Sequence, residues 1–274
     1  MTTWLITGCS TGIGRALAEA AIAAGHNVAA TARDRSKVAD LAEGNDHVLA
    51  LTLDVTDPEQ IAAAVAEAED VFGGVDVLIN NAGYGYRAAI EEGNEADVRR
   101  LFDTHFFGSA AMIKAVLPGM RARRSGTIVN FSSIAATYTP VGSGYYAAAK
   151  AAIDGMTGAL RGELEPLGIT AMVIEPGGFA TDFAGRSLTQ SSTVIDDYAG
   201  TAGKRRIENV VNAPAKGDPQ KAAETILRVV DNASDPGFLL LGSDAFEMYR
   251  ASLHKRLDLI DQWEAVSRST DFDT

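Results

Sequence analysis

Thr7-Gly-Cys-Ser-Thr-Gly-Ile-Gly14 follows a short apolar run at residues 4–7 and opens a helical pattern over residues 12–24. Glycines allow tight turning and close backbone approach, and a helix N-terminus offers free N–H groups and a positive dipole to an anion. A strand before such a loop and a helix after it are typical of a dinucleotide-binding element. The spacing is Gly-x-x-x-Gly-x-Gly rather than Gly-x-Gly-x-x-Gly. We interpret Cys9 as a small filler, because its local sequence offers no base.

Short apolar runs alternate with longer helical stretches along the rest of the chain. The runs are near-continuous in Val, Ile, Leu and Ala, as in a parallel sheet covered on both faces. Their alternation with helices predicts βαβ units and an α/β fold with one doubly wound, Rossmann-type parallel sheet. We predict strands at 4–7, 27–32, 47–53, 75–80, 127–132, 169–175 and 238–241, and helices at 12–24, 58–72, 95–117, 143–164, 218–230 and 243–267.

The chain has 274 residues, with no internal repeat and no linker-like segment. We therefore expect a single domain over residues 1–274. Residues 184–216 are rich in Ser, Thr, Gly and charge and have no clear apolar period. A segment this long without regular structure is usually a functional lid or disordered, and it follows a strand at the ligand-binding edge of the sheet. We predict a mobile substrate lid there and an amphipathic C-terminal helix at 243–267.

Composition narrows the classes of partner. The hydrophobic fraction of 46% supports a sizeable core, and the formal net charge of −12 disfavours nucleic acid and anionic membranes as partners. A single cysteine excludes an internal disulfide framework and fits a reducing compartment. The sequence has no run of about 18 apolar residues, the length that a membrane-spanning helix needs. The start shows no secretory signal, so we expect a cytoplasmic protein.

Tyr146-Ala-Ala-Ala-Lys150 pairs a proton donor with a cation, and Ser133 lies upstream. At spacing i, i+4 the phenol and the ammonium share one helix face. A nearby cation favours phenolate and lowers the tyrosine pKa, and a general acid or base works best near the working pH. The pattern alone is common on surface helices. Together with the glycine loop it indicates a redox enzyme acting on a carbonyl or an alcohol.

The end of the second strand bears on the choice of cofactor. In dinucleotide folds an acid at this place binds the 2′-hydroxyl of NAD, whereas an arginine accommodates the 2′-phosphate of NADP. Ala32 takes the acid position here and Arg33 follows it. This favours NADP(H). NAD(H) stays open, because a shift of one residue would bring Asp34 into the acid position.

These motifs together resemble the classical short-chain dehydrogenase/reductase family, over roughly residues 3–182. Further matches are Asn80-Asn-Ala-Gly83 after the fourth strand, Asp54-Val55, Ile128-Val-Asn-Phe-Ser-Ser133 and the Pro176-Gly177 to Thr181 motif. The overall pattern resembles the branch containing hydroxysteroid and retinol dehydrogenases.

The resemblance implies a role for each matching position. Tyr146 would exchange the proton with the substrate oxygen, Lys150 would lower the tyrosine pKa and bind the nicotinamide ribose, and Ser133, with Ser132 as a competing candidate, would hydrogen-bond the substrate oxygen. The implied cofactor-binding residues are Gly8, Ser10, Gly12, Ile13 and Gly14 at the pyrophosphate, Asp54 and Val55 at the adenine, Asn81, Ala82 and Gly83 at the adenosine side, and Pro176, Gly177, Phe179 and Thr181 at the nicotinamide. No metal site is expected.

Two positions depart from the family pattern. His105 stands where members usually carry an asparagine of the proton relay, so it either joins that relay or only packs. Thr11 replaces a basic residue of many NADP-dependent members, which leaves the phosphate to Arg33, with Arg35 or Lys37 as further candidates. Lys204-Arg-Arg206 reads as plain surface charge. The resemblance also implies a homodimer or homotetramer built on the helix around residues 147–162.

The reading that follows is an NADP(H)-dependent oxidoreductase that interconverts a ketone or aldehyde and an alcohol by hydride transfer. The long variable segment after Thr181 and the aromatic residues near His105 suggest a largely apolar small-molecule substrate. One alternative is an epimerase or double-bond reductase on the same scaffold. Another is a protein that senses NADP(H) without turnover, which the complete Ser133–Tyr146–Lys150 set disfavours.

Overall fold

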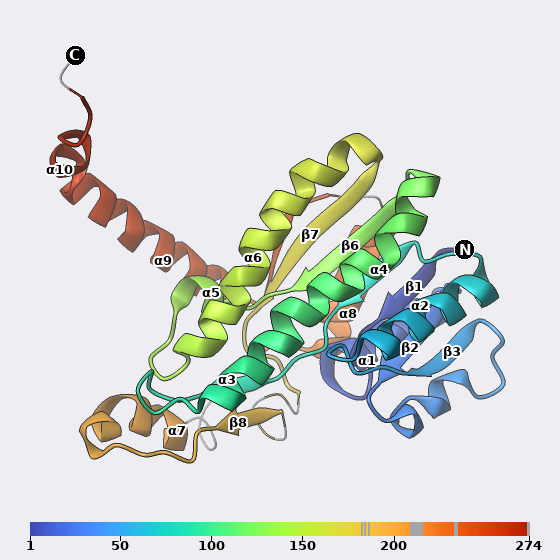
Figure 1. Ribbon diagram of the computed structural model, residues 1–274, viewed down its shortest axis with the longest axis horizontal. Coiled ribbons are helices and arrows are strands. Elements are labelled where there is room, and N and C mark those ends of the chain that lie inside the picture. The colour runs from blue at the N-terminus through green and yellow to red at the C-terminus, as the bar shows by residue number, and fades with distance from the viewer. Residues whose placement is uncertain (182, 184, 186, 209–215, 233–234, 273–274) are drawn as a thin grey trace.

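A seven-stranded parallel sheet forms the centre of the computed structural model (Figure 1), which describes residues 1–181, 183, 185, 187–208, 216–232 and 235–272. Its strand order is β3-β2-β1-β4-β6-β7-β9. The strands are β1 (Thr3–Ile6), β2 (Asn27–Ala32), β3 (Val48–Thr52), β4 (Val77–Asn80), β6 (Gly126–Phe131), β7 (Ile169–Pro176) and β9 (Phe238–Leu241). The order reverses between β1 and β4, which confirms the predicted doubly wound sheet and creates a crevice at its carboxyl edge.

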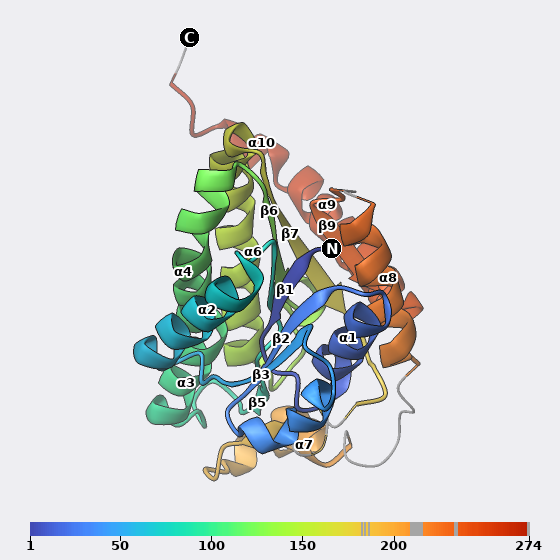
Figure 2. The same ribbon diagram turned by 90° about the vertical axis from the view of Figure 1, so that its right-hand side faces the viewer.

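Helices cover both faces of this sheet (Figure 2). One face carries α1 (Gly12–Ala23) and α8 (Pro219–Asp231), and the other carries α2 (Pro58–Phe72), α4 (Gly108–Arg123) and α6 (Gly144–Leu164). Side chains of a strand alternate between the two layers. Trp4 and Ile6 therefore pack on the α1 side, whereas Leu5 packs on the α2 side. Burial on both sides explains why the strands read as continuous apolar runs.

The helix predicted at 95–117 is longer than expected and is not uniform. It comprises α3 (Glu95–Phe102), a π-helical turn η3 (Asp103–Phe107) and α4, which continues through Pro118 to Arg123. Proline lacks an N–H group and usually ends a helix, which favours an end before Pro118. The predicted end at residue 117 was wrong, because α4 continues past this proline. Such π turns occur mostly as single turns within helices and often lie at functional sites.

The predicted irregular insertion contains short elements in its described part. These are β8 (Leu188–Gln190), η6 (Asp196–Tyr198), η7 (Ala199–Gly203) and α7 (Lys204–Glu208). Strand β8 pairs in parallel with β5 (Gly85–Arg87), which the sequence did not predict. Residues 184, 186 and 209–215 of this segment lie outside the described part of the chain. Other short elements are η1 (Arg35–Lys37), η2 (Ala39–Ala42), α5 (Ala135–Tyr138) and η4 (Glu165–Leu167).

The C-terminal helix predicted at 243–267 is present in two pieces. Helix α9 (Ser243–Gln262) begins directly after β9, and α10 (Glu264–Arg268) follows a break at Trp263. Figure 1 shows the two pieces extending away from the sheet. In the described ranges, no helix combines the length and the apolar character that a membrane crossing requires.

Candidate active site

A cleft of about 1570 Å³ opens at the carboxyl edge of the sheet, beside the reversal of strand order. Open α/β sheets bind their ligands at this place. The cleft brings together predicted residues that are far apart in sequence. From the predicted site it is lined by Gly8, Ser10, Gly12, Ile13, Arg33, Asp54, Val55, Asn81, Ala82, Gly83, His105, Ser133, Tyr146, Lys150, Pro176, Gly177, Phe179 and Thr181.

The glycine loop has the backbone shape that its sequence predicts. Gly8 and Gly12 adopt φ of +74° and +65°, values that side chains other than glycine rarely accept. A Cβ on Gly14 would lie 2.6 Å from the backbone oxygen of Gly8. Thr11 begins α1 without a side-chain cap, so its first N–H groups face the cleft unbonded by a capping group. The loop therefore fits a pyrophosphate.

Cys9 is a buried filler in this loop, as expected. Its Sγ donates to the backbone oxygen of Ile6 at 3.2 Å, and its side chain is fully buried. Burial raises the pKa of the thiol to about 12. Because the thiolate is the reactive form, this residue is not a nucleophile at neutral pH.

The Asn80–Gly83 segment holds the glycine loop in place through hydrogen bonds. Thr7 Oγ1 accepts from the backbone N–H groups of Asn81 and Ala82 at 2.9 and 3.0 Å. Asn81 Nδ2 donates to the backbone oxygens of Thr7 and Gly8 at 2.9 and 3.2 Å. The side chain of Asn81 is thus committed to the loop, which it fixes beside the end of β4.

Arg33, Asp34 and Lys37 line the adenosine end of the cleft after β2. Asp34 is occupied within its own turn, where its carboxylate accepts from the backbone N–H and the hydroxyl of Ser36 at 3.0 and 2.7 Å. These two hydrogen bonds lower the pKa of Asp34. Ser36 thus engages one oxygen of the Asp34 carboxylate, Oδ1, and Arg33 beside it is exposed.

Ser133, Tyr146 and Lys150 meet at the centre of the cleft. The Ser133 hydroxyl lies close enough to the Tyr146 phenol to act on its pKa, and Lys150 Nζ lies 5.8 Å from the centre of the Tyr146 ring. Lys150 Nζ donates to the backbone oxygen of Phe131 at 2.7 Å. Ser132, the competing serine, points elsewhere and donates to the backbone oxygen of Lys150 at 3.1 Å.

The pKa values of this group differ from the expectation that Lys150 lowers the tyrosine pKa. Burial raises the pKa of Tyr146 to about 12, against the opposing hydrogen bond from Ser133. Burial also lowers the pKa of Lys150 to about 7, opposed by the charge of Asp154. Desolvation, which disfavours any charged form, is thus the main cause of both shifts.

Two carboxyl groups lie behind Lys150. Asp154, one helical turn further along α6, lies close enough to Ser132 and to Glu175 of β7 for both to act on its pKa. Burial and the neighbouring charge of Asp154 raise the pKa of Glu175, and burial raises the pKa of Asp154. Two carboxylates that share a site cannot both ionise readily, so this pair keeps a proton near neutral pH.

His105 lies in the π-helical turn and is 2% exposed. Its Nε2 is 2.7 Å from the backbone oxygen and 3.2 Å from the backbone nitrogen of Tyr84, and its ring packs edge-on against Tyr146 at 5.7 Å. Burial, with the nearby charge of Lys150, lowers the pKa of His105 well below its ordinary value. A Cβ on Gly83 would lie 2.8 Å from Nδ1, so a glycine is needed beside this ring.

The Pro176–Thr181 motif crosses above the glycine loop. A Cβ on Gly12 would touch Thr181 at 3.5 Å, and the backbone N–H of Gly178 donates to Asp244 Oδ2 at 2.7 Å. Asp244 belongs to the first turn of α9. The start of the C-terminal helix therefore fixes the Pro176–Thr181 motif at the cleft, which the sequence did not indicate.

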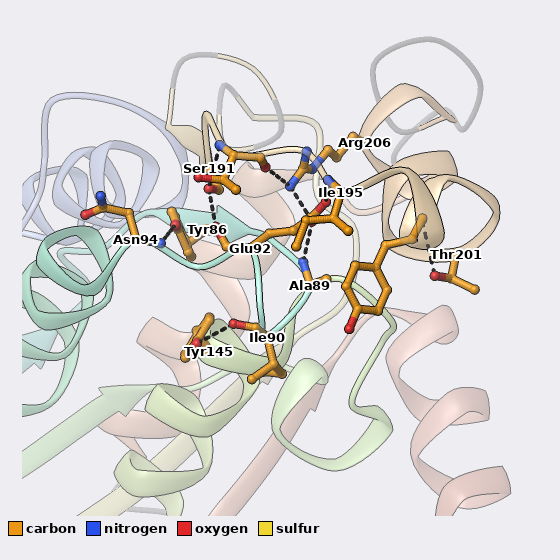
Figure 3. A network of polar contacts seen from close by, with 12 residues as sticks. Tyr86, Ala89, Ile90, Glu92, Asn94, Tyr145, Ser191, Ile195, Thr201 and Arg206 are labelled. Carbon is orange, nitrogen blue, oxygen red and sulfur yellow. Dashed lines mark hydrogen bonds and ion pairs between the residues drawn. The ribbon is translucent and has the colours of Figure 1, made fainter.

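Glu92 connects the insertion to the body of the protein (Figure 3). It is 1% exposed, pairs with Arg206 at 2.6 Å and accepts from the backbone N–H groups of Ala89 and Ile195 at 3.0 and 2.9 Å. The Ser191 hydroxyl donates to its backbone oxygen. Burial acts to raise the pKa of Glu92, but these hydrogen bonds and the Arg206 charge outweigh it and lower the pKa. The expectation that 204–206 is plain surface was wrong for Arg206.

Within the described ranges, no group of His, Cys, Asp and Glu side chains has the arrangement of a metal site. The described part of the insertion lines the cleft through residues such as Leu188, Thr189 and Arg205. This places it where a substrate lid would lie.

Comparison with known proteins identifies the class. The family model for short chain dehydrogenases matches residues 2–192. The oxidoreductase BOA17 of Botryotinia fuckeliana is 37% identical, with 96% of this chain and 97% of that protein covered. Bovine (Bos taurus) retinol dehydrogenase 8 is 34% identical, with 85% of this chain and 79% of that protein covered. A crystal structure of a short-chain dehydrogenase from Streptomyces avermitilis has 40% identity and a TM-score of 0.91, over 99% of this chain and 100% of that one.

The chain belongs to the short-chain dehydrogenase/reductase family of oxidoreductases. The resemblance seen in the sequence is thereby confirmed at the level of the family.

Proposed function

We propose that this protein is an NADP(H)-dependent oxidoreductase that interconverts a ketone or aldehyde and an alcohol. The observation that supports it best is the convergence of Ser133, Tyr146 and Lys150 on the cleft that also contains the glycine loop and Arg33. A nucleotide sensor without turnover would not need this set of proton-transfer groups. An epimerase or double-bond reductase on the same scaffold is the alternative.

In the proposed reaction the cofactor supplies or accepts the hydride. Tyr146 donates its phenolic proton to the carbonyl oxygen during reduction and accepts it during oxidation. Ser133, which lies beside the Tyr146 phenol, holds the substrate oxygen next to that phenol. Lys150 would bind the nicotinamide ribose, and its ammonium would favour the phenolate that remains after proton transfer.

A largely apolar substrate fits the other wall of the cleft. Tyr84, Tyr138, Phe183, Leu188 and Met248 line it. The Phe183 ring lies 6.0 Å from the Tyr146 ring, so an apolar group would contact Phe183 while its carbonyl reaches the phenol. Aromatic and aliphatic walls with a few polar groups are typical of small-molecule sites.

The test is oxidation of NADPH with a panel of ketones and aldehydes, for the parent and for Tyr146→Phe. The variant keeps the ring and removes the proton, so we expect turnover to fall roughly 10²–10⁴-fold while NADPH still binds. Ser132→Ala is the matched control, since Ser132 bonds the α6 backbone rather than the tyrosine. Near-normal turnover in Tyr146→Phe would refute the assigned role.

The proposal includes a homo-oligomer, for which α6 offers a surface. Gly155, Gly158 and Gly162 lie on this helix with open space where a Cβ would be. A face of small residues lets another helix approach closely. Sedimentation of the parent and of Gly158→Arg tests it, because a monomeric parent would exclude this interface.

A further inference from the structure

Arg87 lies in the wall of the cleft without a carboxylate partner. It ends β5 and is only 6% exposed. Within the described part of the chain it forms no ion pair, and its side chain makes a single hydrogen bond, from Nη1 to the backbone oxygen of Arg205 at 3.1 Å. A guanidinium carries five N–H donors. Most of those of Arg87 therefore lack a protein acceptor.

Arg205 of α7 lines the same cleft and, among the residues that the structure describes, forms no ion pair. Its Nε is buried without a hydrogen-bond partner. Burial, with the charge of Arg205, lowers the pKa of Arg87 to about 10, and no carboxylate of the described residues opposes that effect. Two like charges side by side at the wall of a cleft repel each other, and an anion bound between them would relieve that repulsion.

Neighbouring arginines are neutralised by acids. Arg206, the next residue, pairs with Glu92, and Arg100, which also lines the cleft, pairs with Asp97. The chain has 36 acidic against 24 basic residues, so carboxylates are plentiful. Arg87 differs from an exposed arginine in being buried, so water solvates it less, yet the described residues give it no carboxylate; this points to a ligand that supplies the negative charge.

Strand β5 connects this place to the reacting groups. Tyr86 shares a buried cluster with Tyr146, and Gly85 packs against Leu188 and Phe183, whose ring adjoins Tyr146. A strand rises about 3.3 Å per residue. Arg87 thus follows, on the same strand, the residues that adjoin Tyr146, and it lines the same cleft.

We propose that Arg87 and Arg205 form a subsite for an anionic group at the far end of the substrate. The substrate class is then an oxo or hydroxy acid with an apolar chain between its carboxylate and its reacting carbon. This inference rests on the proposed oxidoreductase function and makes its substrate class specific. The planar fork of a guanidinium matches a carboxylate, and the apolar wall matches the intervening chain.

The experiment compares straight-chain oxo acids of increasing length with their methyl esters as substrates for NADPH oxidation. We expect kcat/KM for the best acid to exceed that of its ester by roughly tenfold to a hundredfold, as for charged hydrogen bonds. Arg87→Gln should abolish this preference, mainly through KM, and Arg87→Lys should restore part of it. Arg205→Gln should weaken it. Arg100→Gln, whose arginine already has an acid partner, should leave it unchanged.

Other outcomes would overturn the proposal. Equal kcat/KM values for acid and ester in the parent would exclude the subsite. An equal loss for both substrates in Arg87→Gln and Arg87→Lys would mean that Arg87 only anchors α7 through the Arg205 carbonyl.

A binding measurement separates this failure from failure of the proposed function. Calorimetric titration with octanoate and with methyl octanoate needs no turnover. If no carbonyl compound is reduced but octanoate binds in an Arg87-dependent manner, the oxidoreductase proposal fails and the anion subsite stands. If carbonyl compounds are reduced but octanoate binds the parent no better than its ester, the subsite fails alone.

Discussion

At the scale of single residues, Arg33 and Asp34 bear on whether NADPH or NADH binds more tightly. Ser36 engages Oδ1 of Asp34, and the exposed Arg33 beside it is the group that we propose for a 2′-phosphate. We expect NADPH to bind roughly tenfold to more than a hundredfold more tightly than NADH. Arg33→Ala should erase most of that difference, whereas Arg35→Ala should not. Equal affinities of the parent for the two cofactors, measured by fluorescence titration, would defeat the assignment.

His105 is the second residue for which a specific prediction can be made, concerning its protonation state. A relay histidine would add an ionisation near its ordinary pKa of about 6.5 to the rate profile. Burial lowers the pKa of His105, so we expect a neutral ring and no such ionisation. The ring instead positions Tyr84 and packs against Tyr146.

Substitutions of His105 test this positioning role. His105→Asn can still bond the Tyr84 backbone and should retain most activity. His105→Leu leaves those buried backbone groups unsatisfied and should lower the free energy of unfolding by about 1–3 kcal/mol. An ionisation near neutral pH that disappears in His105→Asn would instead establish the relay.

At the scale of elements, the buried Glu92 carboxylate helps to tie the insertion to the body, beside the pairing of β8 with β5. Glu92→Gln would leave Arg206 without its charge partner, and removal of one member of a buried pair costs about 3–5 kcal/mol. We therefore expect a lower urea midpoint and faster amide exchange over residues 188–208. Glu91→Gln, whose carboxylate meets only the exposed Tyr198 hydroxyl, is the control. Unchanged exchange over 188–208 in Glu92→Gln would show that the pair does not hold the insertion.

The mobile lid predicted from the sequence is refined by this network. Its described part is hydrogen-bonded through Glu92, Ser191 and Ile195 and pairs β8 with β5. We still propose that the segment covers the substrate. Any opening of residues 188–208 would have to break the Glu92 contacts, so exchange there should depend on that residue.

At the scale of the whole molecule, the Asp154–Glu175 pair makes stability depend on pH. The pKa of Glu175 is raised in the folded protein, so the folded state binds a proton that the unfolded state has released above about pH 4.3. The stability from this group is full below that value and is lost as pH rises toward the folded-state pKa. Glu175→Gln should therefore gain stability over the parent as pH rises, in thermal denaturation. Exposed Glu163→Gln should show no such trend, and a parallel trend in both variants would exclude this origin.

Much of the fold was predictable because its signals are local. Continuous apolar runs, the Thr7–Gly14 loop and the Tyr146–Lys150 spacing each lie within a few residues, and the sheet places them at one edge. Glu92 and Arg206 are 114 positions apart, and neither carries a pattern that marks burial. The π turn at His105 and the desolvation of Tyr146 arise only from packing, so sequence patterns could not reveal them.

The single cysteine of the chain allows opening of the glycine loop to be followed by chemical labelling. Cys9 lies fully buried inside the glycine loop, and with no second cysteine in the sequence any alkylation signal has a single source. A maleimide can reach it only when the loop separates from Ile6 and Thr31, which bond its side chain and backbone. The half-life of maleimide labelling therefore reports how rarely the glycine loop opens. The measurement requires no mutation and no attached dye.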